Sequence, residues 1–321
     1  MMPLPQPSDF TAKSLPPNPF HLTAPVVHAA YNICLSLELR ANLVVLPSEK
    51  HPSALLCVRV LGFTLIESPA QAINTDGSDH TLLALGKYYI QRLICLFKLV
   101  PSPDDALVRD GHHCLFNPNL YDATYAIENN ATVTARNLRR QLSTLQCAHI
   151  LTEGDDIESP SQWAASIWAP MYPPMNGHPL ENMLTLSDTL RWFFDRLAIW
   201  LQPTDEPSTY TITSSEALLL EELPSRIITL TTLDPEALPP PNPAYLRIHA
   251  ASCRIAHMSG AADYVEEVLR EEKEIRVRVE SMGHLAQDGS SADIITRNEY
   301  GLRPLVTLQK IEGAQTHYVQ K

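Results

Sequence analysis

Glycine is scarce in this chain, and basic residues are fewer than acidic ones. There are 11 glycines against 27 prolines in 321 residues, and the sequence has no glycine-rich phosphate loop and no dinucleotide-binding fingerprint. The 24 lysines and arginines are outnumbered by 36 aspartates and glutamates, which gives a formal net charge of −12. Proteins that grip phosphates without sequence preference usually present a basic surface. Any contact with nucleic acid must therefore come from a local basic patch.

Long apolar runs and paired cysteines are also missing. The most apolar segment, residues 82–100, predicts a helix of a folded domain rather than a membrane span, because charged residues such as Lys87 and Arg92 interrupt it. The six cysteines have no paired spacing, which indicates free thiols. The N-terminus has no secretory-signal pattern. We therefore expect an intracellular protein, nuclear or cytoplasmic, with no membrane partner and no small-molecule cofactor.

The patterns predict an α+β fold in four parts. These are a proline-rich tail (1–25), a β-containing segment plus helix (26–100), a core with a long insertion (101–205), and a strand pair with a helical extension and a loose tail (206–321).

Two strands are expected in the N-terminal segment, over 43–46 and 53–63, because valine and leucine are frequent there and prolines flank both stretches. A helix is expected at about 80–99.

The core predicts a β-hairpin from 112–117 and 147–152, followed by a helix over 187–201 whose apolar residues recur at helical spacing. Beyond it, β-branched residues predict strands at 209–213 and 227–232, and 245–282 predicts a helix broken near Gly260.

Three short motifs follow one another in the core. Ala-His-Ile stands at 148–150, Asn-Met-Leu-Thr-Leu at 182–186 and Phe-Asp-Arg at 194–196, and Arg-Asp-Gly-His-His-Cys-Leu precedes them at 109–115. In order and spacing these motifs resemble the HNH nuclease family, in particular its fungal-type endonuclease domains. The resemblance implies a ββα-metal (His-Me finger-like) core that hydrolyses phosphodiester bonds of DNA with a divalent ion, Mg²⁺ or Zn²⁺.

The same resemblance assigns roles to single residues. His149 is the expected general base, and Asn182 is expected to brace its loop by holding a carbonyl near position 150. The family's metal-ligand histidine is replaced by Arg191, nine residues after Asn182, and a family glycine is replaced by Leu197. A guanidinium has five donors and no lone pair for a metal, so the chain carries the pattern without one ligand.

Three interpretations of Arg191 stay open. In the first, the metal is lost and the guanidinium takes over part of its charge and binds a phosphate. In the second, the site is displaced, with His149 and Asp195 at the metal, and the candidates for the missing ligand are Asp195, His112, His113 and His178. In the third, Arg191 is structural and pairs with Asp188 or Asp195.

Two functions follow from these interpretations. The chain is either a metal-dependent DNA endonuclease impaired at Arg191, or a non-catalytic module that binds nucleic acid or protein through the same fold. In the first case a divalent metal is required, and in the second no cofactor is. The basic residues nearest the motifs, and therefore the candidates for nucleic-acid contact, are Arg136, Arg139, Arg140 and Arg196.

Overall fold

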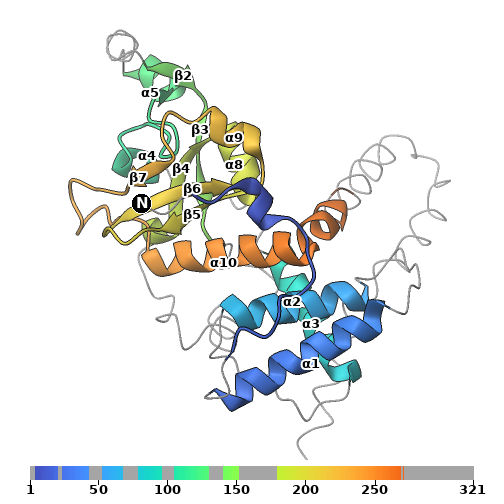
Figure 1. Cartoon of the computed structure of the whole chain (residues 1–321). Helices are drawn as coiled ribbons and strands as arrows, with labels where there is room; N and C mark the ends of the chain where they lie inside the picture. The colour runs from blue at the N-terminus through green and yellow to red at the C-terminus, as the bar shows by residue number, and fades with distance from the viewer. Residues whose placement is uncertain are drawn as a thin grey trace, which may run out of the picture. The chain divides into compact units, whose positions relative to one another are not determined.

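The computed structural model describes residues 4–20, 24–42, 53–67, 79–95, 105–129, 140–151, 179–268 and 270. The chain divides into two compact units, residues 1–266 and 267–321, and the following account concerns the first. Helices and three small sheets make up the described part, so the expected α+β class is confirmed (Figure 1). None of the helices in these ranges is long and apolar enough to cross a membrane.

The N-terminal part is helical. A short 3-10 helix, η1 (Pro7–Phe10), precedes the helices α1 (Pro25–Asn42), α2 (Ala54–Glu67) and α3 (Asp79–Cys95). The predicted helix at 80–99 is thus found as α3. Helix α2 packs against α1 and α3, and also against α10 (Pro243–Ser259).

The prediction of a strand at 53–63 is wrong, because these residues lie mostly in α2. Nearly every residue from Cys57 to Leu65 is buried, since three other helices surround α2. A helix that is covered on several sides has no polar face, and its apolar run then cannot be told from a buried strand by periodicity. The described residues of 26–100 contain no strand, and the strand expected at 43–46 lies outside them.

The core begins with a short helix and two sheets of two strands each. The elements of the core are α4 (Asp105–Arg109), β1 (Leu120–Asp122), α5 (Ala123–Glu128), β2 (Gln141–Ser143), β3 (Leu145–His149), η2 (Pro179–Asn182), β4 (Met183–Ser187) and α8 (Asp188–Asp195). Strands β1 and β2 pair in parallel, β3 and β4 pair antiparallel, and α8 packs on both β3 and β4.

The prediction of a hairpin between 112–117 and 147–152 is wrong. Strand β3 pairs with β4, so that Leu145 faces Ser187 and His149 faces Met183. Residues 112–117 form a turn and an extended stretch beside β4, where Leu115 N donates to Thr185 O (2.9 Å). All five residues of β4 are buried, and a strand covered on both faces shows no alternation that would reveal its pairing.

The helix expected over 187–201 ends at Asp195, and β5 (Ile199–Pro203) follows. Leu197 has a left-handed backbone with φ of +56°, which stops the helix and reverses the chain. Strand β5 then pairs antiparallel with β6 (Thr209–Ser214), and β6 pairs with β7 (Ile227–Thr229). The predicted strand pair is thus confirmed, with β5 as an unforeseen third strand; α9 (Ala217–Glu221) follows β6.

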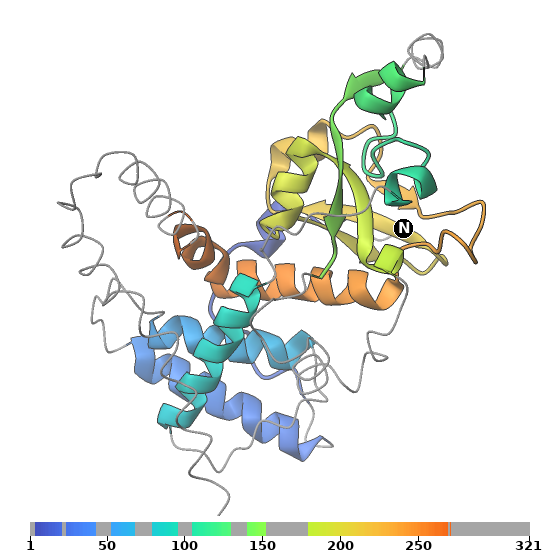
Figure 2. The ribbon, with the colours of Figure 1, turned by 180° about the vertical axis from the view of Figure 1, so that it is seen from behind.

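Helix α10 joins the sheet to the helices of the N-terminal part. It contacts β5 as well as α2, and Figures 1 and 2 show it between them. Asn242 caps its start by accepting a hydrogen bond from Ala244 N (2.9 Å), and Gly260, with φ of +84°, ends it. The helix break predicted near Gly260 is therefore confirmed.

A histidine of α10 fixes this helix against the core. The ring of His249 stacks on Phe194 of α8, with centroids 3.9 Å apart and planes 9° from parallel. Its Nδ1 lies 3.6 Å from Cys253 Sγ within the same helix. Because the ring is fully buried, desolvation lowers the pKa of His249 to about 3, against a backbone hydrogen bond with Phe194 that raises it.

A buried ion pair ties α4 to the start of β4. Arg109 and Asp110 are paired in two places, Nε to Oδ1 (2.7 Å) and Nη2 to Oδ2 (2.8 Å), and their side chains are 0% and 2% exposed. Arg109 also donates to the carbonyls of Leu180 (2.7 Å) and Met183 (2.9 Å), while Asp110 accepts from Thr185 N (3.2 Å). Arg109 therefore holds the backbone on both sides of Asn182, and Asp110 holds it further on, at Thr185.

We expect Arg109→Met to lower the free energy of unfolding by about 3–5 kcal/mol, because it leaves Asp110 charged and unpaired inside the protein. Urea unfolding measures this loss. The control is Arg40→Met, which breaks a pair with Asp79 whose two side chains are each 55% exposed; there we expect about 0–1 kcal/mol. Equal losses in the two variants would contradict a special role for the buried pair.

Protonation of His249 should destabilise the fold in acid. Its pKa is lower in the folded chain than in the unfolded chain, so this contribution to stability is complete above about pH 6.5 and is lost as the pH falls toward 3. The loss approaches about 1.4 kcal/mol per pH unit in that window. His249→Phe, which keeps a ring on Phe194, should flatten the dependence, as measured by urea unfolding from pH 7 to 4. Leu218→Ala, at an exposed residue of α9, removes no titratable group and should leave the dependence unchanged.

Candidate functional site

The hairpin β3–β4 and the helix α8 bring the three motifs into one unit. His149 is the last residue of β3 and is half-buried, whereas Ile150 and Leu151, which follow it, are buried. Asn182 stands immediately before β4, and Arg191 lies in α8. A strand, a strand and a helix thus follow one another in the order in which the motifs occur.

Asn182 binds the chain just after His149 through three hydrogen bonds. Its Nδ2 donates to Leu151 O (2.7 Å), its Oδ1 accepts from Leu151 N (2.9 Å), and its own carbonyl accepts from Ile150 N (2.8 Å). The side chain is largely buried, at 8% exposure for the residue. The bracing contact expected near position 150 is therefore present, at Leu151.

Arg191 is held by one residue of its own helix and one of β3. Its Nε donates to Asp195 Oδ2 (3.4 Å), one turn further along α8, and its Nη1 donates to Gln146 Oε1 (2.5 Å). The side chain is 14% exposed. Of the two acidic partners considered, the structure pairs it with Asp195 and not with Asp188.

The environment of Asp195 has two opposing effects. Burial raises the pKa of this carboxyl above its ordinary value, whereas the charges of Arg191 and Arg196 and the hydrogen bond from Arg191 lower it. Burial is the larger effect, so the carboxyl is a partly desolvated acid that depends on Arg191 for its counter-charge. A loss of Arg191 would raise its pKa further.

These residues do not fit a divalent metal ion. Arg191 stands at the helix position where the motif pattern has a metal ligand, and its guanidinium cannot ligate a metal and would repel one. The nearest carboxylate, Asp195, is already hydrogen-bonded to that guanidinium. Within the described ranges, no three His, Cys, Asp or Glu residues lie together in a way that could hold a metal ion.

The histidines proposed for a displaced site are engaged elsewhere or lie outside the described residues. The ring of His112 stacks on Tyr125 with centroids 3.5 Å apart, and burial lowers its pKa. Nδ1 of His113 donates to the Gly111 carbonyl (3.1 Å). His178 is outside the described ranges.

Two of the four predicted basic residues can be placed. The Arg140 guanidinium lies 5.5 Å from the ring centre of Tyr121, and that of Arg196 lies 3.8 Å from the ring centre of Trp192. Arg136 and Arg139 are outside the described residues. Of the two that can be placed, Arg196 is the residue next to α8, where it forms the C-terminal cap of the helix that carries Arg191.

Sequence reasoning missed two features of the site. Gln146, which holds Arg191, lies three residues before His149, and its contact with α8 can be recognised only once the packing of that helix on β3 is known. The second feature is the Arg109–Asp110 ion pair. Its only sign in the sequence is that two opposite charges stand next to each other at the end of a short apolar helix.

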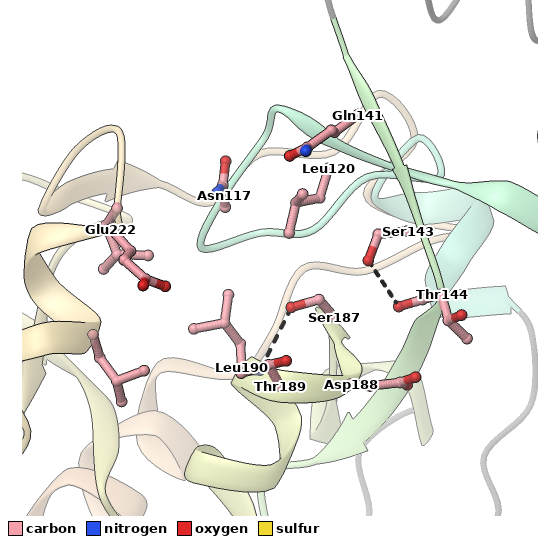
Figure 3. A pocket seen from close by; sticks show the side chains of 12 residues that line it. Asn117, Leu120, Gln141, Ser143, Thr144, Ser187, Asp188, Thr189, Leu190 and Glu222 are labelled. Carbon is pink, nitrogen blue, oxygen red and sulfur yellow. Dashed lines mark hydrogen bonds between the residues drawn. The ribbon is translucent and has the colours of Figure 1, made fainter.

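A hollow of about 450 Å³ lies at the other end of the hairpin (Figure 3). Ser187 lines it, and Ser187 pairs with Leu145, four residues away from His149 along β3. Polar side chains around it include Asn117, Gln141 and the acidic Glu222. Because of this position, the hollow does not belong to the site around His149 and Asn182.

No model of a known protein family matches this chain, and neither does any curated protein or solved structure. The site must therefore be judged on its geometry.

Removing the Asn182 side chain should loosen the loop after His149. We expect Asn182→Ala to cost about 1–3 kcal/mol, because it leaves the buried N–H and C=O of Leu151 without partners. Hydrogen exchange should accelerate at Leu151 more than in the buried helix α10, because the hydrogen bonds lost are those of Leu151. Asn129→Ala, at an exposed helix end, should stay within about 0.5 kcal/mol of wild type. Equal acceleration throughout the fold would contradict a local bracing role.

Proposed function

We propose that the unit formed by β3, β4 and α8 is an HNH-type nuclease-like module. In it, Arg191 takes the position of the metal ligand, and the module binds a phosphate of nucleic acid without hydrolysing the phosphodiester bond. The proposed likeness to a nuclease is supported by the motifs. The proposal that the module binds without hydrolysis is supported by the contacts of Arg191.

Beside the motifs, the observation that carries the nuclease-like part of the proposal is the Asn182–Leu151 contact. An asparagine that both donates to and accepts from one backbone residue fixes the loop after His149 more firmly than a single hydrogen bond would. Such bracing suits a residue whose imidazole must stay at a defined place, as a general base must.

Arg191 is suited to bind an anion in its present position. Two of the five guanidinium N–H donors are used, one on Asp195 and one on Gln146, so that three remain. Its two partners restrict the orientation of the group before any ligand arrives, which reduces the entropy lost on binding. A guanidinium binds phosphate well, whereas it supplies neither the ligand for a metal nor a Lewis acid for hydrolysis.

The acidic net charge of −12 limits how such a module can bind. Long-range attraction to DNA is expected to be weak, so that binding depends on a few local contacts, each of which adds about one to the slope of log affinity against log salt. Short oligonucleotides at low ionic strength are therefore the suitable ligands for a first assay.

A working metal-dependent endonuclease is the second candidate. It is favoured by the presence of His149 at the end of β3 and of Asp195 one turn after Arg191 at the end of α8, since α8 packs on β3. It requires a further ligand, for which His178 remains a candidate outside the described residues.

Nicking of a supercoiled plasmid with Mg²⁺, Mn²⁺, Ni²⁺ or Zn²⁺ separates the two candidates. We expect no cleavage by the wild type and metal-dependent cleavage by Arg191→His, because the substitution restores a ligand on a fixed scaffold. The double variant Arg191→His/His149→Ala should be silent. Arg191→Gln, which removes the charge without adding a ligand, is the matched control and should also be silent.

The melting temperature gives a second readout of the same variants. Saturating metal should raise it in Arg191→His and leave it unchanged in the wild type, since only a ligand that binds the folded state stabilises it. Cleavage by the wild type that vanishes in His149→Ala would overturn the proposal and establish the second candidate.

A further inference from the structure

The exposed face of α8 carries a large aromatic side chain beside the candidate site. Trp192 follows Arg191 directly and is 46% exposed, although tryptophan buries more apolar surface than any other residue when it is covered. Its ring meets Phe193 edge to face, with centroids 4.7 Å apart. Phe193 therefore limits the movement of the indole from one side and leaves much of it open to solvent.

Arg196 lies over the Trp192 ring. Its guanidinium carbon is 3.8 Å from the ring centroid, and the two residues are four apart, which places them on one side of the helix. The charge of Arg196 acts on Asp195, yet within the described residues its guanidinium makes no hydrogen bond and no ion pair with a side-chain carboxylate. Its Nε is shielded from solvent and has no hydrogen-bond partner.

Arg196 has no ion pair because the nearby acidic residue is already paired with Arg191. Asp195 is the only acid beside both arginines in the helix sequence, and Arg191 occupies it. Arg196 is consequently a cation that is held in place by stacking on a ring and not by a counter-charge. A side chain that is positioned in this way keeps its N–H donors available for a ligand.

We propose that Trp192 and Arg196 bind single-stranded nucleic acid, with a base stacked on the exposed part of the indole and the adjoining phosphate bound by the Arg196 guanidinium. This inference rests on the proposed function and deepens it, because it names the substrate class and a second contact next to Arg191. An aromatic ring beside a cation that has no ion pair is the combination that suits an unpaired strand, whose bases are free to stack. In a duplex the bases are already stacked on one another.

Equilibrium binding of labelled oligonucleotides to the full chain tests the inference at low salt. The probes are a dT oligonucleotide and a duplex of equal length. For the single strand we expect Trp192→Ala to weaken binding roughly 5- to 150-fold, the range found for loss of one base–aromatic stack. Trp192→Phe should keep most of the affinity. Leu218→Ala, at a 74% exposed residue of α9, is the matched control.

Arg196→Gln should weaken binding of the single strand and lower the slope of log affinity against log salt by about one, because one phosphate contact is lost. Arg191→Gln should weaken the duplex and the single strand alike. A cooperative thermal transition shows that each variant is folded, and the melting temperature should stay unchanged for the variants of Trp192, which is 46% exposed.

The outcomes separate the two levels of the argument. Loss of affinity in Arg191→Gln with none in Trp192→Ala overturns this inference and leaves the proposed function standing. Loss in Trp192→Ala with none in Arg191→Gln supports the surface and contradicts a phosphate at Arg191. Absence of oligonucleotide binding by the wild type overturns both. A change in association state in Trp192→Ala, with unchanged oligonucleotide affinity, would show that this surface meets protein and would also overturn the inference.

Discussion

The buried pair of Arg109 and Asp110 is the interaction on which the geometry of the site depends. Two charges inside a protein are costly unless their remaining hydrogen-bonding capacity is used. Here that capacity is spent on the backbone at Leu180, Met183 and Thr185, on both sides of Asn182. Through these bonds the pair sets the position of Asn182, and Asn182 sets that of the chain after His149. The helix α4 thereby determines a site to which it contributes no reacting group.

Features that depend on neighbouring residues could be predicted from the sequence. Helix α3, the end of α10 at Gly260 and the pairing of β6 with β7 all follow from local patterns of apolar and turn residues. The contact of Asn182 with a carbonyl near position 150 was expected from the motif resemblance alone. For the helices and strands a few adjacent positions contain the whole signal, whereas the contact of Asn182 joins residues that are 31 positions apart.

Features that depend on distant packing could not. Helix α2 looks like a strand because three helices cover it, and this cover is invisible in its own residues. The partner of β3 lies more than thirty residues further along the chain, in a fully buried strand without alternation. Gln146 illustrates the consequence for the site: an unremarkable polar residue becomes the second partner of Arg191 only through the way the hairpin packs on α8.

The fold accommodates both departures from the motif pattern, at Leu197 and at Arg191. Leu197 stands where that pattern has glycine, and its φ of +56° is a conformation that costs a leucine about 1–2 kcal/mol. Its side chain is 1% exposed, and burial of a leucine contributes about 1.5–3 kcal/mol, which offsets the strain. Arg191 is likewise accommodated by Asp195 and Gln146. Since neither change disturbs the backbone around Asn182, the second of them alters what the site can bind and leaves the scaffold as it is.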